Sequence, residues 1–227
     1  MSINESIDEL RKPGVQVVSF FNLGFILYSF LVFFNGLDYK YLPNYLKIVT
    51  IIELLIVVIG LLQYFRFISF DENFQVNKVL LKRYAKFLTI VNFLGIFNAV
   101  FVINNLFYFI AIQNHVDLFP NWLMSMLVML ICFILWSTGL VLMWNSFPKL
   151  EKYISGKRRT FIGIGLALTS CLVIIFKIVE YIILPNAGDS KFIVPGSILV
   201  ILGCQLATAE LIKRYASFKI LVLDKEY

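Results

Sequence analysis

The stretch Leu42-Pro43-Asn44-Tyr45-Leu46 recurs in altered form as Phe119-Pro120-Asn121-Trp122-Leu123 and again as Val194-Pro195-Gly196-Ser197-Ile198. The three prolines are about 76 residues apart. Each follows an apolar run and a short loop, and each precedes a second apolar run. Proline is favoured in the first turn of a helix, because its missing N–H has no partner there. The pattern predicts three tandem helical hairpins, over residues 11–68, 80–148 and 157–214.

The composition predicts a membrane protein. Of the 227 residues, 60% are hydrophobic and 15% are charged, whereas about 25% are charged in a typical soluble domain. Runs of about 20 apolar residues are long enough to cross the roughly 30 Å hydrocarbon core. We therefore predict an all-α integral membrane protein, with one membrane domain over residues 1–227 and six transmembrane helices. The expected spans are Val15–Phe34, Leu46–Phe65, Phe87–Ile112, Leu123–Trp144, Phe161–Leu184 and Ile193–Ile212.

Basic residues predict the orientation of the chain. Sixteen of the 20 Lys and Arg residues fall in the N-terminal head, the second loop, the fourth loop and the C-terminal tail. Only Lys40, Lys47 and Lys191 lie on the other side, and Lys177 lies deep within a span. Cytoplasmic loops carry an excess of Lys and Arg, so both termini are expected in the cytoplasm. The net charge of +6 then reflects topology and contact with the lipid bilayer, and we expect no nucleic-acid partner.

The hairpin repeat has two interpretations. Each unit has two spans, so all three units share one orientation and could be related by a pseudo-threefold axis along the membrane normal. Alternatively, any protein built from membrane hairpins places basic residues at cytoplasmic helix starts and proline at the opposite helix starts. The abundance of Phe, Ile and Lys is typical of an AT-rich genome. We expect the plasma membrane of a prokaryote.

Three charged residues form the first candidate site. Glu53 and Lys177 are each expected about 12 Å below the same membrane surface, since each lies eight residues from that end of its helix. Glu180 follows Lys177 by three residues and shares its face. Charges within hydrocarbon are costly and are often functional. We therefore expect a Glu53–Lys177–Glu180 cluster, with a purely structural buried ion pair as the alternative.

Polar and small residues also follow single faces of two predicted helices. Asn92, Asn98 and Asn105 share a face of the third span, and Gln205 lies on a similar face of the sixth. Small residues allow helices to approach closely, and amides form hydrogen bonds between helices. We interpret these residues primarily as a helix-packing face.

Reactive motifs are missing from the sequence. His115 is the only histidine, which excludes a haem held by two histidines of this chain and most zinc sites. The sequence has no phosphate-binding loop, no Gly-x-Ser-x-Gly and no His-Glu-x-x-His. We expect no catalytic residues, no resident metal and no cofactor.

Three functions remain compatible with these features. The first is a non-catalytic subunit of a larger membrane complex, with other membrane subunits or further copies of the chain as partners. The second is a transporter or channel for a small solute or ion, in which Glu53, Lys177 and Glu180 handle the cargo or a proton. The third is a membrane-embedded acid–base enzyme that acts on a lipid.

Overall fold

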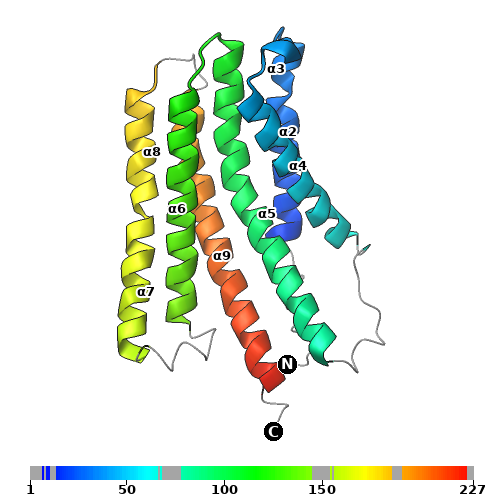
Figure 1. The fold of residues 1–227 in the computed structure, drawn as a ribbon, viewed down its shortest axis with the longest axis vertical. Helices are drawn as coiled ribbons and strands as arrows, with labels where there is room; N and C mark the ends of the chain where they lie inside the picture. Colours follow the sequence, from blue (N-terminus) through cyan, green and yellow to red (C-terminus); the bar gives the residue numbers. More distant parts are fainter. Residues whose placement is uncertain are drawn as a thin grey trace.

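The computed structural model describes residues 7, 9–10, 14–65, 67, 78–144, 154, 156–185 and 191–223. Within these residues the regular structure is entirely helical, without strands (Figure 1). The α-helices are α2 (Gly14–Ser29), α3 (Leu31–Phe34), α4 (Asn44–Tyr64), α5 (Lys78–Gln113), α6 (Phe119–Met143), α7 (Gly156–Ser170), α8 (Leu172–Ile183) and α9 (Ile193–Leu223), and a 3-10 helix η1 spans Tyr39–Tyr41.

Within the described residues, six helical segments are long and apolar enough to cross a membrane, as predicted. Of these, α5 and α9 extend furthest beyond the predicted spans. The 36 residues of α5 correspond to about 54 Å of helix, far more than the roughly 30 Å of a hydrocarbon core. Both α5 and α9 extend past their neighbours at the end of the bundle where the described part of the chain begins and ends (Figure 1).

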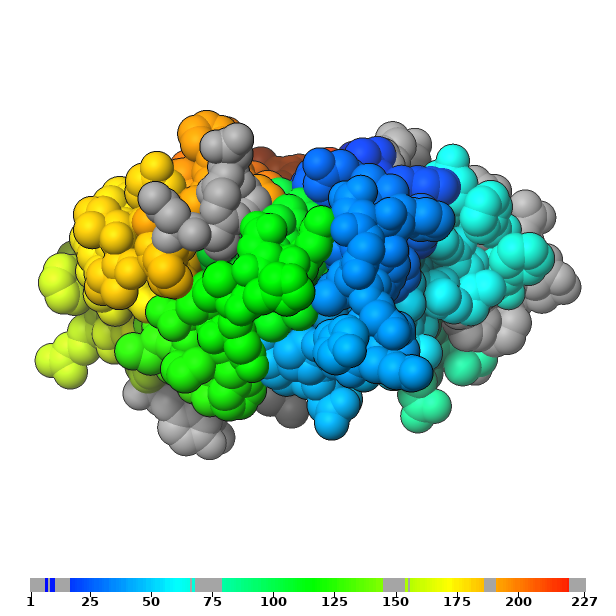
Figure 2. Space-filling view, turned by 90° about the horizontal axis from the view of Figure 1, so that it is seen from above, coloured from blue at the N-terminus to red at the C-terminus, as the bar shows by residue number. Residues whose placement is uncertain are grey.

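The bundle is organised around α5. This helix packs against α2, α4, α6 and α9. In its most apolar stretch 61% of the residues are buried, compared with 22–33% in the corresponding stretches of the other five segments. Viewed along the bundle, α7, α8 and the start of α9 lie on one side and α2 and α4 on the other, with α5 and α6 between them (Figure 2). If a threefold axis related the three hairpins, their first helices would have similar surroundings. The first helix of the second hairpin, α5, is far more buried than its counterparts, so the structure does not support a pseudo-threefold axis.

The first membrane-spanning segment is interrupted briefly between α2 and α3, and the fifth is interrupted between α7 and α8. Between α7 and α8, the N–H of Cys171 bonds to the Leu168 carbonyl three residues earlier, and the N–H of Ile174 bonds to that of Cys171. The Ser170 hydroxyl and the Cys171 thiol both donate to the Ala167 carbonyl. Such local side-chain bonds compete with the helical pattern. The sequence had suggested no break in this span, because it contains neither Pro nor Gly at this point.

The N-terminal segment is attached to the bundle at the end where α5 begins. Leu10 is fully buried, and its carbonyl accepts a 2.8 Å hydrogen bond from the amide of Asn92. The guanidinium of Arg214 donates to the Glu9 carbonyl at 2.9 Å. Several basic residues used to predict the orientation lie outside the described residues: Arg11, Lys12, Arg66, Lys149, Lys152 and Lys225.

The chain reverses direction at the opposite end through two similar turns. The N–H of Leu37 bonds to the Val32 carbonyl and the N–H of Gly36 to the Phe33 carbonyl; the same pattern ends α5 at His115. Both are Schellman motifs, which place one residue in the left-handed region. Gly36 has φ 97° and His115 has φ 60°. These turns bring the loops after α3 and α5 to the same end of the bundle.

Two glycines let the backbones of α6 and α7 approach each other closely. A Cβ built on Gly163 would lie 2.7 Å from the Gly139 carbonyl oxygen, and one built on Gly139 would lie 2.6 Å from that of Gly163. Glycine at both positions therefore allows the two backbones to touch, as is common where membrane helices pack.

We expect Gly163→Val to separate α6 from α7 and to destabilise the protein by about 1–3 kcal/mol, because an inserted side chain has no space. Thermal unfolding in detergent measures this effect. Gly165→Val is the matched control, since a Cβ at Gly165 has no neighbour within 4 Å and the intrinsic cost of valine in a helix is the same. Equal melting temperatures for the two variants would contradict the close contact.

Candidate functional site

A buried ion pair connects two residues of α8. The Lys177 ammonium lies 2.7 Å from Oε2 of Glu180, and the two side chains are 0% and 3% exposed. Their separation by three residues places them on neighbouring positions of one helix face. The sequence predicted this proximity from spacing alone.

The remaining partners of the ion pair come from α5 and α6. Lys177 Nζ also donates to Oδ1 of Asn104 at 2.5 Å and to the hydroxyl of Ser125 at 2.7 Å. The Tyr108 hydroxyl donates to Oε1 of Glu180 at 2.8 Å. Lys177 thus uses three acceptors, as many as its ammonium has protons. We refer to Lys177, Glu180, Asn104, Ser125 and Tyr108 as the lysine network.

Glu53 lies in a second network, between α4 and α5. Its Oε1 accepts a 2.6 Å hydrogen bond from the amide of Asn105, and its backbone carbonyl accepts one of 3.3 Å from Asn98. The Trp122 indole on α6 donates to Oδ1 of Asn105 at 2.7 Å. Glu53 is 4% exposed. We refer to Glu53, Asn98, Asn105 and Trp122 as the glutamate network.

The structure therefore brings Lys177 and Glu180 together but places Glu53 apart from them. No direct hydrogen bond or ion pair joins Glu53 to either residue in the described part of the chain. The two networks meet α5 at the same level, because Asn104 and Asn105 are consecutive. Successive helical side chains point about 100° apart, so one amide reaches towards α8 and the next towards α4. Asn104 and Asn105 therefore lie between Glu53 and the Lys177–Glu180 pair.

Four members of the networks were not singled out from the sequence as site residues: Asn104, Tyr108, Trp122 and Ser125. Asn104 stands beside Asn105 but lies off the predicted polar face. Tyr108, Trp122 and Ser125 are isolated polar groups within apolar runs, where such residues are common. The asparagine pair at one level of a span was the only signal in the sequence that could have identified this junction.

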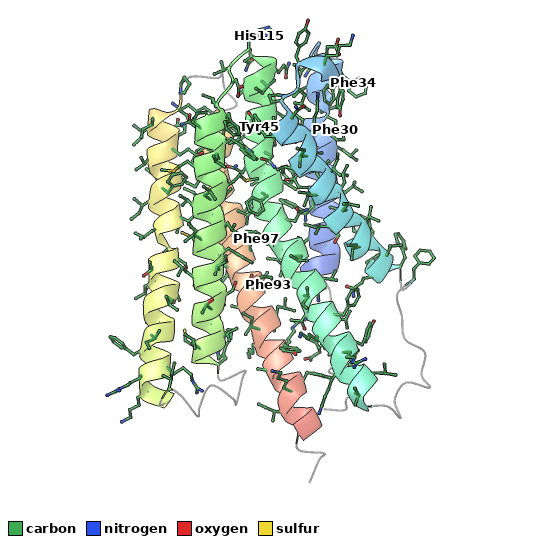
Figure 3. All side chains as sticks on the ribbon, in the orientation of Figure 1. Phe30, Phe34, Tyr45, Phe93, Phe97 and His115 are labelled. Carbon is green, nitrogen blue, oxygen red and sulfur yellow. The ribbon has the colours of Figure 1, made fainter. Side chains whose placement is uncertain are left out.

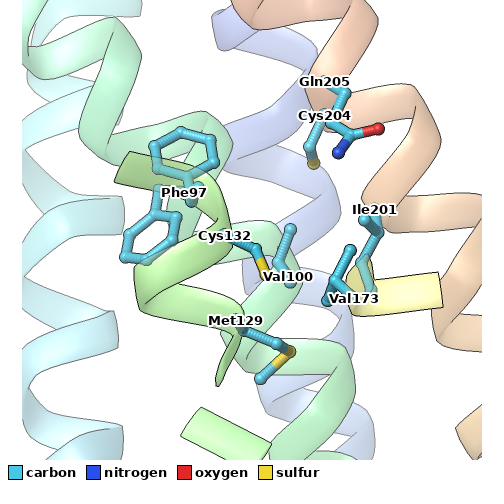
Figure 4. Close-up of a pocket in the computed structure, with 9 residues that line it drawn as sticks. Phe97, Val100, Met129, Cys132, Val173, Ile201, Cys204 and Gln205 are labelled. Atoms are coloured by element: carbon cyan, nitrogen blue, oxygen red, sulfur yellow. The ribbon is translucent and has the colours of Figure 1, made fainter. Parts of the chain in front are cut away.

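The other predicted packing residues occupy separate places. Asn92 binds the N-terminal segment, as described above. Gln205 lines a small cavity with Cys132, Cys204 and Met129 between α5, α6, α8 and α9 (Figure 4). The cavity has a volume of about 20 Å³, which is sufficient for roughly one water molecule. No group of three His, Cys, Asp or Glu residues that could hold a metal occurs among the described residues.

A chain of contacts leads from the glutamate network to the surface. The rings of Trp122 and Tyr45 lie 4.6 Å apart, and the Tyr45 hydroxyl donates to Oδ1 of Asp117 at 3.2 Å. Asp117 lines a cavity of about 470 Å³ with Asp38, His115 and Gln113. Tyr45 lies below His115, which occupies the top of the bundle (Figure 3).

These features define a six-helix bundle of the membrane-spanning type, with polar networks buried at the level of Asn104 and Asn105. The family model described as "Domain of unknown function (DUF5079)" matches residues 4–227. The chain therefore belongs to this family. No curated protein and no solved structure matches the chain.

We expect Lys177→Met alone to destabilise the protein by about 3–5 kcal/mol, because it leaves Glu180 buried without its cation. Glu180→Gln in the same chain should recover at least half of this loss. Thermal unfolding of wild type, both single variants and the double variant gives the coupling directly. The exposed Glu210–Arg214 pair provides a control, and Glu210→Gln should change stability by less than about 1 kcal/mol. Strictly additive losses at Lys177 and Glu180 would contradict the pairing.

Glu53→Gln should be tolerated, because the new amide oxygen can still accept the hydrogen bond from Asn105. Glu53→Leu leaves that buried donor unsatisfied and should cost about 1–3 kcal/mol. The two variants are compared by thermal unfolding, with Ile51→Leu on the exposed face of α4 as a control for the leucine side chain. If Gln and Leu were equally destabilising, the hydrogen bond to Asn105 would not be what holds Glu53.

Proposed function

We propose that this chain is a polytopic membrane protein that acts as a non-catalytic subunit of a larger membrane complex. The observation that carries the proposal is that the buried charges of Glu53, Lys177 and Glu180 are engaged with one another or with neighbouring amides and hydroxyls. The lysine network satisfies all three protons of Lys177 and both oxygens of Glu180. Such an arrangement stabilises helix packing and leaves neither Lys177 nor Glu180 free to act as an acid, base or nucleophile.

Both termini are proposed to lie in the cytoplasm, and the membrane is proposed to be the plasma membrane of a prokaryote. The excess of Lys and Arg at one end supports the orientation. The described ends of the chain lie at one end of the bundle (Figure 1), as an even number of crossings requires.

The face formed by α7 and α8 is the proposed contact with other subunits. This segment has the smallest buried share of the six, at 22%, although it carries the lysine network on its inner side. Its outer side presents large apolar residues, including Leu168, Ile175 and Ile182. In hydrocarbon such a surface can contact either lipid or the apolar side of another helix. The partner would be another membrane subunit or a second copy of the chain.

Transport of a small solute or ion is the second candidate, and the contacts from the outer cavity towards Glu53 favour it. A series of contacts connects a polar surface cavity with the buried carboxyl group of Glu53, through Asp117, Tyr45, Trp122 and Asn105. Intramembrane carboxyl groups often handle protons or ions. The arrangement offers no comparable support for acid–base chemistry on a lipid, because both Glu53 and Glu180 are enclosed by side chains.

Extraction of the full-length protein from native membranes with a mild detergent, followed by native mass spectrometry, tests the subunit proposal. We expect a complex of fixed stoichiometry. Ile175→Trp on α8 should weaken it at least tenfold, because the larger ring would disrupt helix contacts without adding charge. Ile51→Trp on α4 is the matched control and should leave the complex intact.

A single chain without companions would overturn the subunit proposal. Flux measurements in proteoliposomes address the second candidate. A solute or proton flux that Glu53→Leu abolishes while Glu53→Gln alters it, in chains that remain folded, would favour transport over the subunit role.

A further inference from the structure

A groove runs between α5, α6 and α9 at the end of the bundle where α5 begins. Its volume is about 390 Å³, within the range of sites that hold small molecules. It is lined by Lys86, Thr89, Ile90, Phe93, Leu94, Ser137, Thr138, Val141, Ile212 and Tyr215. None of these residues belongs to the lysine or the glutamate network, so the groove is a separate feature. Phe93 is in the lower half of Figure 3.

The wall of the groove is apolar in practice. The Thr89 hydroxyl donates to the Ala85 carbonyl and the Ser137 hydroxyl to the Phe133 carbonyl, each at 2.8 Å. Both hydroxyls are therefore satisfied by their own helices and present carbon atoms to the groove. Ile90, Phe93 and Leu94 line it along α5. An apolar groove of this kind, at the depth of hydrocarbon, fits an acyl chain.

Positive charge lies at one end of the groove. Lys86 is exposed and lines the groove one turn before Ile90. The Lys219 ammonium lies 5.1 Å from the centre of the Tyr215 ring, and Tyr215 is itself part of the wall. Both lysines are therefore associated with the same groove, Lys86 through its own side chain and Lys219 through Tyr215. Positive charge at the membrane surface attracts anionic lipids, and Lys and Tyr are typical of the level of lipid headgroups.

We propose that this groove is a binding site for an anionic glycerophospholipid. One acyl chain lies against Ile90, Phe93 and Leu94, and the phosphate lies between Lys86 and Lys219 beside Tyr215. The two lysines select for a negatively charged headgroup, and the apolar groove selects for an acyl chain. It does not depend on the subunit or transport proposals.

Native mass spectrometry of the full-length protein, titrated with phosphatidylglycerol or phosphatidylcholine of identical acyl chains, tests the site. Phosphatidylglycerol should bind at least tenfold more tightly. The variant Lys86→Gln/Lys219→Gln should lose this preference, with roughly a fivefold loss per lysine and about thirtyfold for the pair. The matched control, Lys47→Gln/Lys191→Gln, removes two lysines that contact tyrosine rings near the other end and should bind phosphatidylglycerol like wild type.

A second variant tests the groove without changing any charge. Val141→Trp fills the groove from α6 and should weaken phosphatidylglycerol binding at least tenfold, while helical content by circular dichroism stays unchanged. Equal affinity for the two lipids in the wild-type protein would overturn the proposal. Undiminished binding by Val141→Trp would overturn it as well, since attraction to surface charge alone would then explain the preference.

Discussion

The rest of this structure depends on how two adjacent amides of α5 satisfy polar groups that have no access to water. Within hydrocarbon a polar group must find its partner inside the protein. Asn104 accepts a hydrogen bond from Lys177, and Asn105 binds both Glu53 and Trp122. Through these two residues α5 is joined to α4, α6 and α8. The most buried helix of the bundle is therefore also the one that organises its polar interactions.

The unequal burial of the helices follows from this arrangement. Because α5 supplies partners to both sides, it lies at the centre, and helices that contribute one polar face remain at the periphery. The α7–α8 segment illustrates this: Lys177 and Glu180 face inwards, while Leu168, Ile175 and Ile182 remain exposed. A threefold arrangement would instead require three equivalent central helices, and the shared proline stretches alone do not require it.

Much of the architecture could be predicted from the sequence, because hydrophobic length is a strong constraint. Runs such as Leu123–Trp144 have no alternative to a membrane span, and the close approach of Lys177 and Glu180 follows from helical spacing. The partner of Glu53 could not be predicted in this way. Whether it meets Lys177 or Asn105 depends on how α4 and α8 are arranged around α5, and that arrangement is set by packing contacts such as Gly139 with Gly163. The tandem hairpin repeat and the cytoplasmic termini stay predictions.

The two ends of the bundle suggest different tasks. At one end, a polar cavity is lined by Asp38, His115 and Asp117. A series of side-chain contacts leads from this cavity towards Glu53. At the other, Lys86 lines an apolar groove, and Lys219 lies beside Tyr215 of its wall. The polar networks lie between these ends and hold the helices in place, so that the outer surfaces can contact lipid or protein without exposing charge to hydrocarbon.

The central claim is that Asn104 serves the lysine network and Asn105 the glutamate network. Hydrogen–deuterium exchange of the full-length protein in lipid nanodiscs tests it most directly. Asn104→Leu should raise exchange in α8 and leave α4 unchanged, whereas Asn105→Leu should raise exchange in α4 and leave α8 unchanged. Uniform acceleration of both helices by either substitution would contradict the account.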